Sequence, residues 1–354
     1  MTAQNTYAAA GVDIAAGARA VDLMRAAVQS TYGPQVLAGI GAFGGLFDAS
    51  ALKDMRQPVL VASTDGVGTK TMVAARMGRW DTIGQDIVNH SVNDILVQGA
   101  RPLFFMDYVA ASKLDPAQIA TVVAGCAAAC REAGCALLGG ETAEMPGVYQ
   151  PGELDLVGTI VGVVERRAII DGRRIQPGDV ILGLPSTGLH TNGFSLARRV
   201  LGDLDWRAPL AAHLPPEDGE TAGAQQSIGE ALLAVHRSYL KPVQTLLSAG
   251  VDVRGLAHIT GGGFVDNLPR VLPAGVGAMI QRGTWPILPI FQLIQHLGGI
   301  SDDEMCHVFN MGLGMLVVLP RSDADRALML LAGDAYVVGE IVAGDGQVRI
   351  TDDR

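Results

Sequence analysis

The sequence predicts an α/β protein with α+β character that is divided into two domains. The chain has 354 residues, which is more than one small domain usually holds. Hydrophobic residues make up 49% of it and charged residues 18%, so a large packed core is available. Short apolar runs rich in β-branched residues alternate with segments of helical periodicity, which favours mixed layers of strands and helices.

The first half, residues 1–170, combines strands with amphipathic helices. Asp115 is expected to cap a helix whose first residue is Pro116, and Thr69 and Lys70 are expected to open another. The main helices are predicted at residues 13–31, 81–99 and 115–133, and the strands at residues 58–64, 102–110, 136–138 and 154–164.

The four predicted strands are apolar on both faces. In the fourth strand, Leu154, Leu156 and Ile160 alternate with Val157, Val161 and Val163. A sheet with one wet face should instead alternate apolar with polar residues. The three helices can cover one face, so we expect a second copy of the chain to cover the other, in an obligate homodimer.

The polar, turn-rich segment 171–179 predicts the boundary between domains of residues 1–170 and 171–354. The second domain again mixes both element types, and residues 205–224 are expected to form an irregular surface insertion. Strands are predicted at residues 179–184, 256–260, 275–281, 313–319 and 335–343, and helices at residues 192–202, 225–248, 287–298 and 322–332.

Composition argues against several classes of function. With 26 basic and 36 acidic residues the net charge is −10, and no basic stripe is present, so no nucleic-acid partner is expected. No apolar run reaches the roughly 20 residues that span a bilayer. The N-terminal segment MTAQNTYAAAG lacks the features of a secretory signal. A cytoplasmic location without membrane attachment is expected.

The cysteines predict buried free thiols. Cys126, Cys130 and Cys135 lack C-x-x-C spacing and a nearby histidine, which makes a metal site a weak alternative. Free thiols fit a reducing compartment.

A glycine-rich loop covers residues 39–45. Gly39, Gly41 and Gly44 satisfy G-x-G-x-x-G, the dinucleotide fingerprint. The context does not fit, because no strand precedes the loop and no long helix follows it. A flexible connection remains an alternative. We favour a loop that folds over nucleotide phosphates, with Gly41, Gly44 and Gly45 close to oxygen atoms.

The segment Thr64–Lys70, TDGVGTK, follows an apolar strand and opens a helix. It lacks P-loop spacing, yet it offers a carboxylate for Mg²⁺, a helix N-terminus and a lysine. Asp65, Gly66, Thr69 and Lys70 are therefore candidates for phosphate chemistry. A plain strand–turn–helix junction capped by Asp65 explains the segment equally well.

Three further carboxylates lie on apolar elements. Asp94 follows Asn93 inside an apolar helix, and Glu141 lies between Gly140 and Thr142 at a strand end. Asp107 lies in the middle of a strand and is a further candidate metal ligand. Unpaired buried carboxylates are costly, and Mg²⁺ bound with ATP would compensate them. Asp65, Asp94 and Glu141 are the predicted metal ligands.

Two loops of the second half contain candidate substrate-binding residues. Ser186–Gly193 carries His190, suited to acid, base or hydrogen-bond donor chemistry, and Asn192. His258 leads into Gly261, Gly262 and Gly263, a plausible anion cradle. The remaining histidines are expected to be surface or packing residues: His90, His213, His236, His296 and His307.

Seven of these segments occur together and in order: DGVGTK, NDILVQGA, PLFFMDY, GGETAEMPG, GLHTNGFSL, HITGGGF and FNMGLGM. From about Tyr7 to its end the chain thereby resembles the phosphoribosylformylglycinamidine cyclo-ligase family. The resemblance is weak only over residues 205–224. In GLHTNG the differences from the family are small changes of the threonine-for-serine type.

The resemblance implies an ATP-dependent ligase of purine biosynthesis. It would convert formylglycinamidine ribonucleotide and ATP to aminoimidazole ribonucleotide, ADP and phosphate through an iminophosphate. Asp65, Asp94 and Lys70 would manage the polyphosphate, and His190 would assist at the formamide. The resemblance also implies a dimeric barrel of N-terminal sheets. It leaves open the catalytic base, the segment that binds the ribose phosphate, and whether a monovalent cation is required.

Related families fit less well. A selenophosphate synthetase would carry a reactive cysteine in residues 39–45, and the formylglycinamidine ribonucleotide synthetase is typically longer. Thiamine-phosphate kinase lacks GGETAEMPG and GLHTNG. A catalytically silent nucleotide-binding scaffold would have lost carboxylates or Lys70, and all are present.

Overall fold

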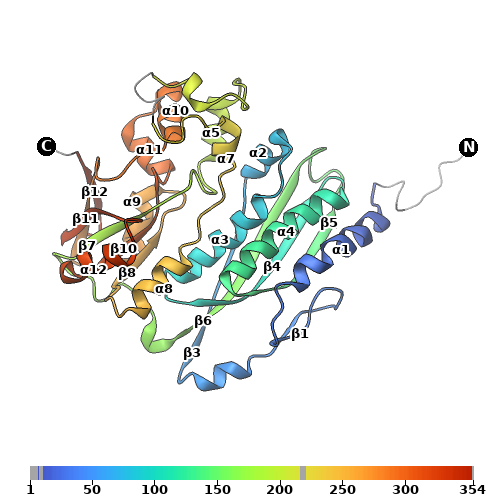
Figure 1. Ribbon diagram of the computed structural model, residues 1–354, viewed down its shortest axis with the longest axis horizontal. Helices are drawn as coiled ribbons and strands as arrows, with labels where there is room; N and C mark the ends of the chain where they lie inside the picture. Colours follow the sequence, from blue (N-terminus) through green and yellow to red (C-terminus); the bar gives the residue numbers. More distant parts are fainter. Residues whose placement is uncertain (1–6, 8–10, 216–220, 353–354) are drawn as a thin grey trace, which may run out of the picture. The chain divides into compact units, whose positions relative to one another are not determined.

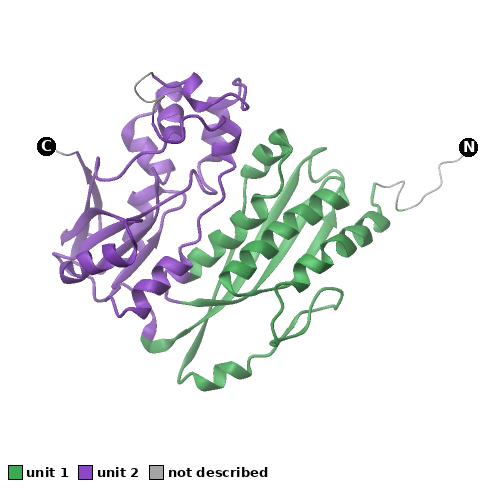
Figure 2. Ribbon diagram, viewed as in Figure 1, with its two compact units in different colours: residues 1–95, 100–167 green, residues 96–99, 168–354 purple. Residues whose placement is uncertain are grey.

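The computed structural model describes residues 7, 11–215 and 221–352. It separates into two compact units (Figure 2), unit 1 within residues 1–95 and 100–167 and unit 2 within residues 96–99 and 168–354. Most of the N-terminal segment tested for a secretory signal, and residues 216–220 of the predicted insertion, lie outside the described residues.

Unit 1 is built on a four-stranded sheet of order β3-β6-β4-β5. β4 and β5 are parallel, and the other neighbouring pairs are antiparallel. The strands are β3 (Pro58–Gly66), β4 (Arg101–Ala111), β5 (Ala136–Glu144) and β6 (Leu154–Glu165). The four predicted strands are confirmed, although β5 continues well past residue 138, through the GGETAE segment.

Helices cover one face of this sheet (Figure 1). They are α1 (Ile14–Gln29), α2 (Lys70–Met77), α3 (Ile83–Leu96) and α4 (Pro116–Ala133). Asp115 caps α4 as predicted, accepting the backbone N–H groups of Ala117 and Gln118 at 2.9 and 3.2 Å. α3 packs so closely on β6 that a Cβ on Gly158 would lie 2.8 Å from Ile87.

The opposite face of the sheet is more open. Leu60 of β3 is 63% exposed and Met106 of β4 is 37% exposed, whereas Leu156 and Ile160 on the helix side are fully buried. The prediction of helices on one face is thus confirmed. Its corollary, a second copy on the other face, stays a prediction.

A short hairpin that the sequence analysis missed carries the glycine-rich loop. Its strands are β1 (Val36–Ala38) and β2 (Leu46–Phe47). The backbone N–H of Ile40 donates to the Tyr32 hydroxyl at 2.8 Å, which ties the loop to the end of α1.

Unit 2 is built on a six-stranded sheet of order β12-β9-β11-β7-β10-β8. All neighbouring pairs are antiparallel except β12 with β9. The strands are β7 (Val180–Pro185), β8 (Gly255–His258), β9 (Val276–Gln281), β10 (Leu313–Leu319), β11 (Tyr336–Ala343) and β12 (Val348–Thr351). β12 was not predicted; the other five were.

The helices of unit 2 agree with the predictions except between residues 225 and 248 and at α11, which was not predicted. They are α5 (Phe194–Leu201), α7 (Ile228–Leu232), α8 (Leu240–Ser248), α9 (Gly263–Asn267), α10 (Pro289–Gly298), α11 (Asp302–Val308) and α12 (Ala324–Leu330). The single predicted helix 225–248 is wrong, because Pro242 has no N–H and its ring would clash with the preceding turn. Pro242 instead occupies the first turn of α8.

The four cysteines are free and buried, as predicted. Within the described ranges, the helices are too short or too polar to cross a bilayer.

Candidate active site

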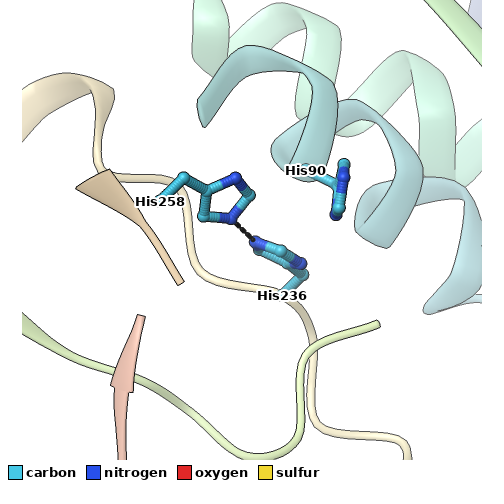
Figure 3. A group of neighbouring side chains, drawn as sticks. All are labelled: His90, His236 and His258. Atoms are coloured by element: carbon cyan, nitrogen blue, oxygen red, sulfur yellow. Dashed lines mark hydrogen bonds between the residues drawn. The ribbon is translucent and has the colours of Figure 1, made fainter. Parts of the chain in front are cut away.

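Unit 1 brings Asp65, His90 and Asp94 together in what we call the carboxylate cluster. Asp65 lies near the end of β3, and the other two lie one turn apart on α3; Figure 3 shows His90 on this helix. His90 Nε2 is 2.9 Å from Asp65 Oδ2 and 3.5 Å from Asp94 Oδ2. The Ser63 hydroxyl donates to Asp94 at 2.9 Å.

Protonation within the carboxylate cluster follows from these contacts. Burial disfavours a charged His90, but hydrogen bonds to Asp65 and Asp94 outweigh it and raise the pKa of His90 to about 9. The hydrogen bond from His90 in turn lowers the pKa of Asp65. The side chain of Asp65 is 49% exposed and that of Asp94 24%, so a ligand can approach both carboxylates.

The carboxylate cluster differs from the predicted one in one member. His90 was expected to be a surface or packing residue. Among the described residues it instead lies close enough to Asp65 and Asp94 for the three side chains to share an ion. Glu141 was expected there, but it lines a separate pocket with Asp107. The helical spacing of Asp86, His90 and Asp94 was the sequence signal that could have identified His90.

The pocket has a volume of about 580 Å³ and lies entirely within unit 1. Apolar side chains of α1, α4 and β5 line its interior, with Asp107 among them. The predicted ATP-binding residues that line it are Gly41, Gly44, Gly45, Gly140, Glu141 and Thr142. The predicted ATP-binding residues thus form two groups, one in this pocket and one around the carboxylate cluster.

Lys70, predicted to contact phosphate, is fully buried in the structure. Its Nζ lies 2.8 Å from Asp86 Oδ2 on α3, and Asp86 is also fully buried. Burial lowers the pKa of Lys70, and the neighbouring Asp86 opposes that shift. Gly66 is the last residue of β3, and Thr69 directly precedes α2.

Unit 2 contains a second group, His190, His236 and His258, which we call the histidine cluster. The rings of His190 and His236 stack, with centroids 4.0 Å apart and planes 21° from parallel. His236 Nε2 lies 3.1 Å from His258 Nε2 (Figure 3). All three side chains are buried. His236, expected to be a surface or packing residue, is therefore part of a polar cluster.

The backbone fixes the orientation of His190. This residue has a φ of 62°, a left-handed conformation that costs energy outside glycine. Its Nε2 accepts the backbone N–H groups of Thr187 and Arg237 at 3.3 and 3.4 Å. A Cβ on Gly314 would lie 2.5 Å from the His190 ring, so only glycine fits beside it.

Neighbouring residues hold the two candidate substrate loops in place. Asn310, in the FNMGLGM segment, donates to the Gly188 carbonyl at 2.9 Å and accepts from the Ser186 hydroxyl at 3.0 Å. A Cβ on Gly261 would lie 3.3 Å from the Asn192 side chain, so the HITGGG and GLHTNG loops are neighbours. Gly262 and Gly263 both have positive φ. The FNMGLGM segment was noted in the sequence, but Asn310 was not predicted to hold the Ser186–Gly193 loop.

Solved structures with the same fold include proteins of different activities. Hydrogenase maturation protein HypE in complex with ATP matches with a TM-score of 0.67 and 20% identity, covering 96% of this chain and 92% of that one. Thiamine-monophosphate kinase from Stenotrophomonas maltophilia matches with a TM-score of 0.62 and 21% identity, covering 94% and 95%. At this identity the likeness establishes the fold alone.

The sequence comparisons are closer. A phosphoribosylformylglycinamidine cyclo-ligase of Gloeobacter violaceus is 52% identical, covering 96% of this chain and 98% of that one. Another from Myxococcus xanthus is 52% identical, covering 97% of each chain. Models of the N- and C-terminal domains of AIR synthase related protein match residues 47–164 and 176–352. The chain therefore belongs to the AIR synthase-related family and groups with its phosphoribosylformylglycinamidine cyclo-ligases.

Proposed function

We propose that this protein is the ATP-dependent cyclo-ligase of purine biosynthesis that forms aminoimidazole ribonucleotide. Identity of about half of all residues, over nearly the whole chain, to several cyclo-ligases carries this proposal. The formamide oxygen of formylglycinamidine ribonucleotide attacks the γ-phosphorus of ATP, and ADP leaves. The amidine nitrogen then attacks the resulting iminophosphate carbon, and phosphate leaves as the ring closes.

Unit 1 supplies the ATP-binding residues. The pocket beside the glycine-rich loop, about 580 Å³, is in the size range of small-molecule sites. Its apolar interior suits a planar base, and the glycines let backbone N–H groups approach phosphate oxygens.

Asp65 and Asp94 are the proposed Mg²⁺ ligands. Their donor set fits the ion, since Mg²⁺ prefers one or two carboxylates together with substrate phosphates. Bound there, Mg²⁺ would neutralise phosphate charge. The Ser63 hydroxyl orients Asp94, and His90 keeps the two carboxylates close together before a cation binds. Glu141, in the pocket, belongs to the nucleotide site in this proposal.

Unit 2 supplies the residues proposed to act on formylglycinamidine ribonucleotide. His190 holds its Nε2 as an acceptor of two backbone N–H groups, which leaves the proton of the neutral ring on Nδ1. It is therefore suited to donate a hydrogen bond rather than to accept a proton at Nε2. Asn192 and Gly261–Gly263 form the adjoining substrate-binding surface.

A direct assay tests the proposal. The protein is incubated with formylglycinamidine ribonucleotide and Mg-ATP, and aminoimidazole ribonucleotide is measured by diazo coupling alongside ADP release. Equimolar product and ADP are expected. ADP release without the aminoimidazole would reject the cyclo-ligase and leave a nucleotide hydrolase or kinase. Repeating the assay with Na⁺ in place of K⁺ determines whether a monovalent cation is needed.

The protein is further proposed to be a cytoplasmic homodimer. The exposed Leu60 and Met106 lie on the open face of the unit 1 sheet, which a second copy would cover in a closed two-fold contact. An obligate interface would bury on the order of 2,000 Å² or more. Four free thiols fit a reducing compartment. Sedimentation equilibrium at low micromolar concentration should give twice the chain mass, and an active monomer would rule the dimer out.

A further inference from the structure

The Lys70–Asp86 ion pair lies outside the carboxylate cluster and joins α2 to α3, the helix that carries His90 and Asp94. The two charged atoms are 2.8 Å apart, and both side chains are completely buried. Removing two charges from water is costly and is offset only by close pairing. Removing either residue alone therefore leaves the other charge buried without this ion pair to offset its desolvation cost.

Asp86, His90 and Asp94 lie at intervals of four residues on α3, so they share one face of the helix. Each contacts the segment that runs from the end of β3 into α2. Asp86 pairs with Lys70, His90 bonds to Asp65, and Asp94 accepts from Ser63. The segment Ser63–Lys70 is thereby attached to α3 at three successive turns.

The Lys70 contact is the last of the three and lies beyond the end of β3. Gly66 and Gly68 precede it, and Gly68 has a positive φ of 65°. Gly66 is held opposite Val157 of β6, and the Val67 N–H donates to the Leu156 carbonyl at 2.9 Å, so the turn that leaves the sheet begins at Gly68. Asp65 itself is held in β3 opposite Gly158, and the attachment at Lys70 holds the turn that follows it against α3.

We infer that Lys70 and Asp86 are positioning residues, whose ion pair holds the Asp65 segment against α3 and so sets the spacing of the two proposed Mg²⁺ ligands. This inference rests on the proposed function and refines it. Lys70 was predicted to contact phosphate; in this inference its charge instead acts through Asp86.

A double-substitution cycle tests the inference. The variants are Lys70→Met, Asp86→Leu and the two combined, which replace the pair by apolar groups of similar volume. Each single variant should lose about 100-fold or more in kcat, since the buried charge that remains loses its ion-pair partner and the site is displaced. The double variant should recover to within about tenfold of wild type, because an apolar contact between the same two positions still holds the segment against α3 and both charges are removed together.

Three measurements separate positioning from phosphate binding. They are kcat and KM for ATP, binding of Mn²⁺ to the nucleotide-free protein by electron paramagnetic resonance, and the thermal unfolding midpoint. In the double variant we expect near-wild-type KM for ATP and near-wild-type Mn²⁺ affinity. The matched control is the exposed pair Arg321–Glu340 of unit 2, changed to Arg321→Met and Glu340→Gln, which should alter none of the three.

Three outcomes overturn the inference. A double variant that is folded but as inactive as Lys70→Met would show that the lysine charge itself is required, and one that is unfolded would show that the pair stabilises the fold rather than positioning the ligands. An Asp86→Leu variant with wild-type turnover and stability would show that the pair positions nothing. If the wild-type protein fails to form aminoimidazole ribonucleotide, the proposed function fails, while Mn²⁺ binding and unfolding still report on the ion pair.

Discussion

The carboxylate cluster of unit 1 and the histidine cluster of unit 2 use the same residue type in opposite ways. His90 lies between two carboxylates that keep it protonated, with a pKa raised to about 9. His190 is surrounded by backbone N–H groups and other imidazole rings. Two N–H groups donate to its Nε2, which favours the neutral ring. The partners, rather than the histidine, decide which charge state is stable.

The two clusters also differ in access. The carboxylate groups of Asp65 and Asp94 are partly exposed, at 49% and 24%, whereas His190 is 1% exposed. A partly exposed anionic site suits exchangeable Mg²⁺ and phosphate. A buried neutral ring suits a fixed hydrogen-bond donor. We therefore expect substitutions in the carboxylate cluster to change the use of Mg-ATP and those in the histidine cluster to change cyclisation.

The largest effect is expected for Asp94→Asn, which keeps the shape of the side chain but removes its charge. Turnover should fall by a factor on the order of 10² or more, as for the loss of one preorganised electrostatic group. Activity should be measured across a Mg²⁺ titration, with the exposed Asp325→Asn as the control. Wild-type turnover at ordinary Mg²⁺ would remove Asp94 from the metal site.

The next largest effect is expected for His190→Ala. Cyclisation should fall roughly 10- to 100-fold, the cost of one lost buried hydrogen bond. ATP affinity should stay close to wild type, because the predicted ATP-binding residues all lie in unit 1. Calorimetric titration with a non-hydrolysable ATP analogue, paired with the turnover assay, separates the two quantities. Equal losses in both would assign His190 to the nucleotide site and remove the contrast between the clusters.

A smaller effect is expected for His236→Phe. Phenylalanine retains the stack on His190 but loses the hydrogen bonds to His258 and Thr191. If those bonds orient the stack, turnover should fall about threefold to tenfold, with KM for ATP unchanged. The exposed His296→Phe is the control. Turnover equal to wild type would mean that stacking alone positions His190.

The sequence predicted best where local chemistry decides the structure. The Asp115–Pro116 start of α4 and the strands β7 to β11 of unit 2 follow from capping, proline geometry and apolar patterning. The helix predicted over residues 225–248 failed because its composition is helical while Pro242 is not compatible with a continuous helix. His236 lies in the segment between α7 and α8, so the same error hid its role.

Long-range contacts were the part that the sequence could not reveal. Apolar surroundings identified Asp65 and Asp94 as unusual, but only the fold shows that His90 joins them and that Glu141 lies in the pocket instead. Likewise, TDGVGTK shows a lysine after two glycines, and nothing local indicates that its partner is Asp86. Such pairings depend on how α3 packs against β3 and α2.

The last expected effect is on stability rather than on turnover, and it concerns Asp107, a carboxylate whose pKa shift, unlike that of Asp65, owes nothing to a cationic neighbour. Burial raises the pKa of Asp107 to about 7, whereas the hydrogen bond from His90 lowers that of Asp65. A raised folded-state pKa means that the stability it contributes is complete below the unfolded value near 4 and is lost as pH rises through about 7. Asp107→Asn cannot ionise. In metal-free buffer it should therefore be more stable than wild type at pH 8.5, by roughly 2 to 4 kcal/mol, and nearly equal to it at pH 4.5.

Thermal unfolding at both pH values measures this difference. Taking wild type minus variant cancels the titration of all other groups, and Asp325→Asn should show no such dependence on pH. A constant difference between Asp107→Asn and wild type across this range would mean that Asp107 has a counter-charge in the folded protein. It would then resemble Asp65, and the contrast between carboxylates with and without a cationic partner would not hold.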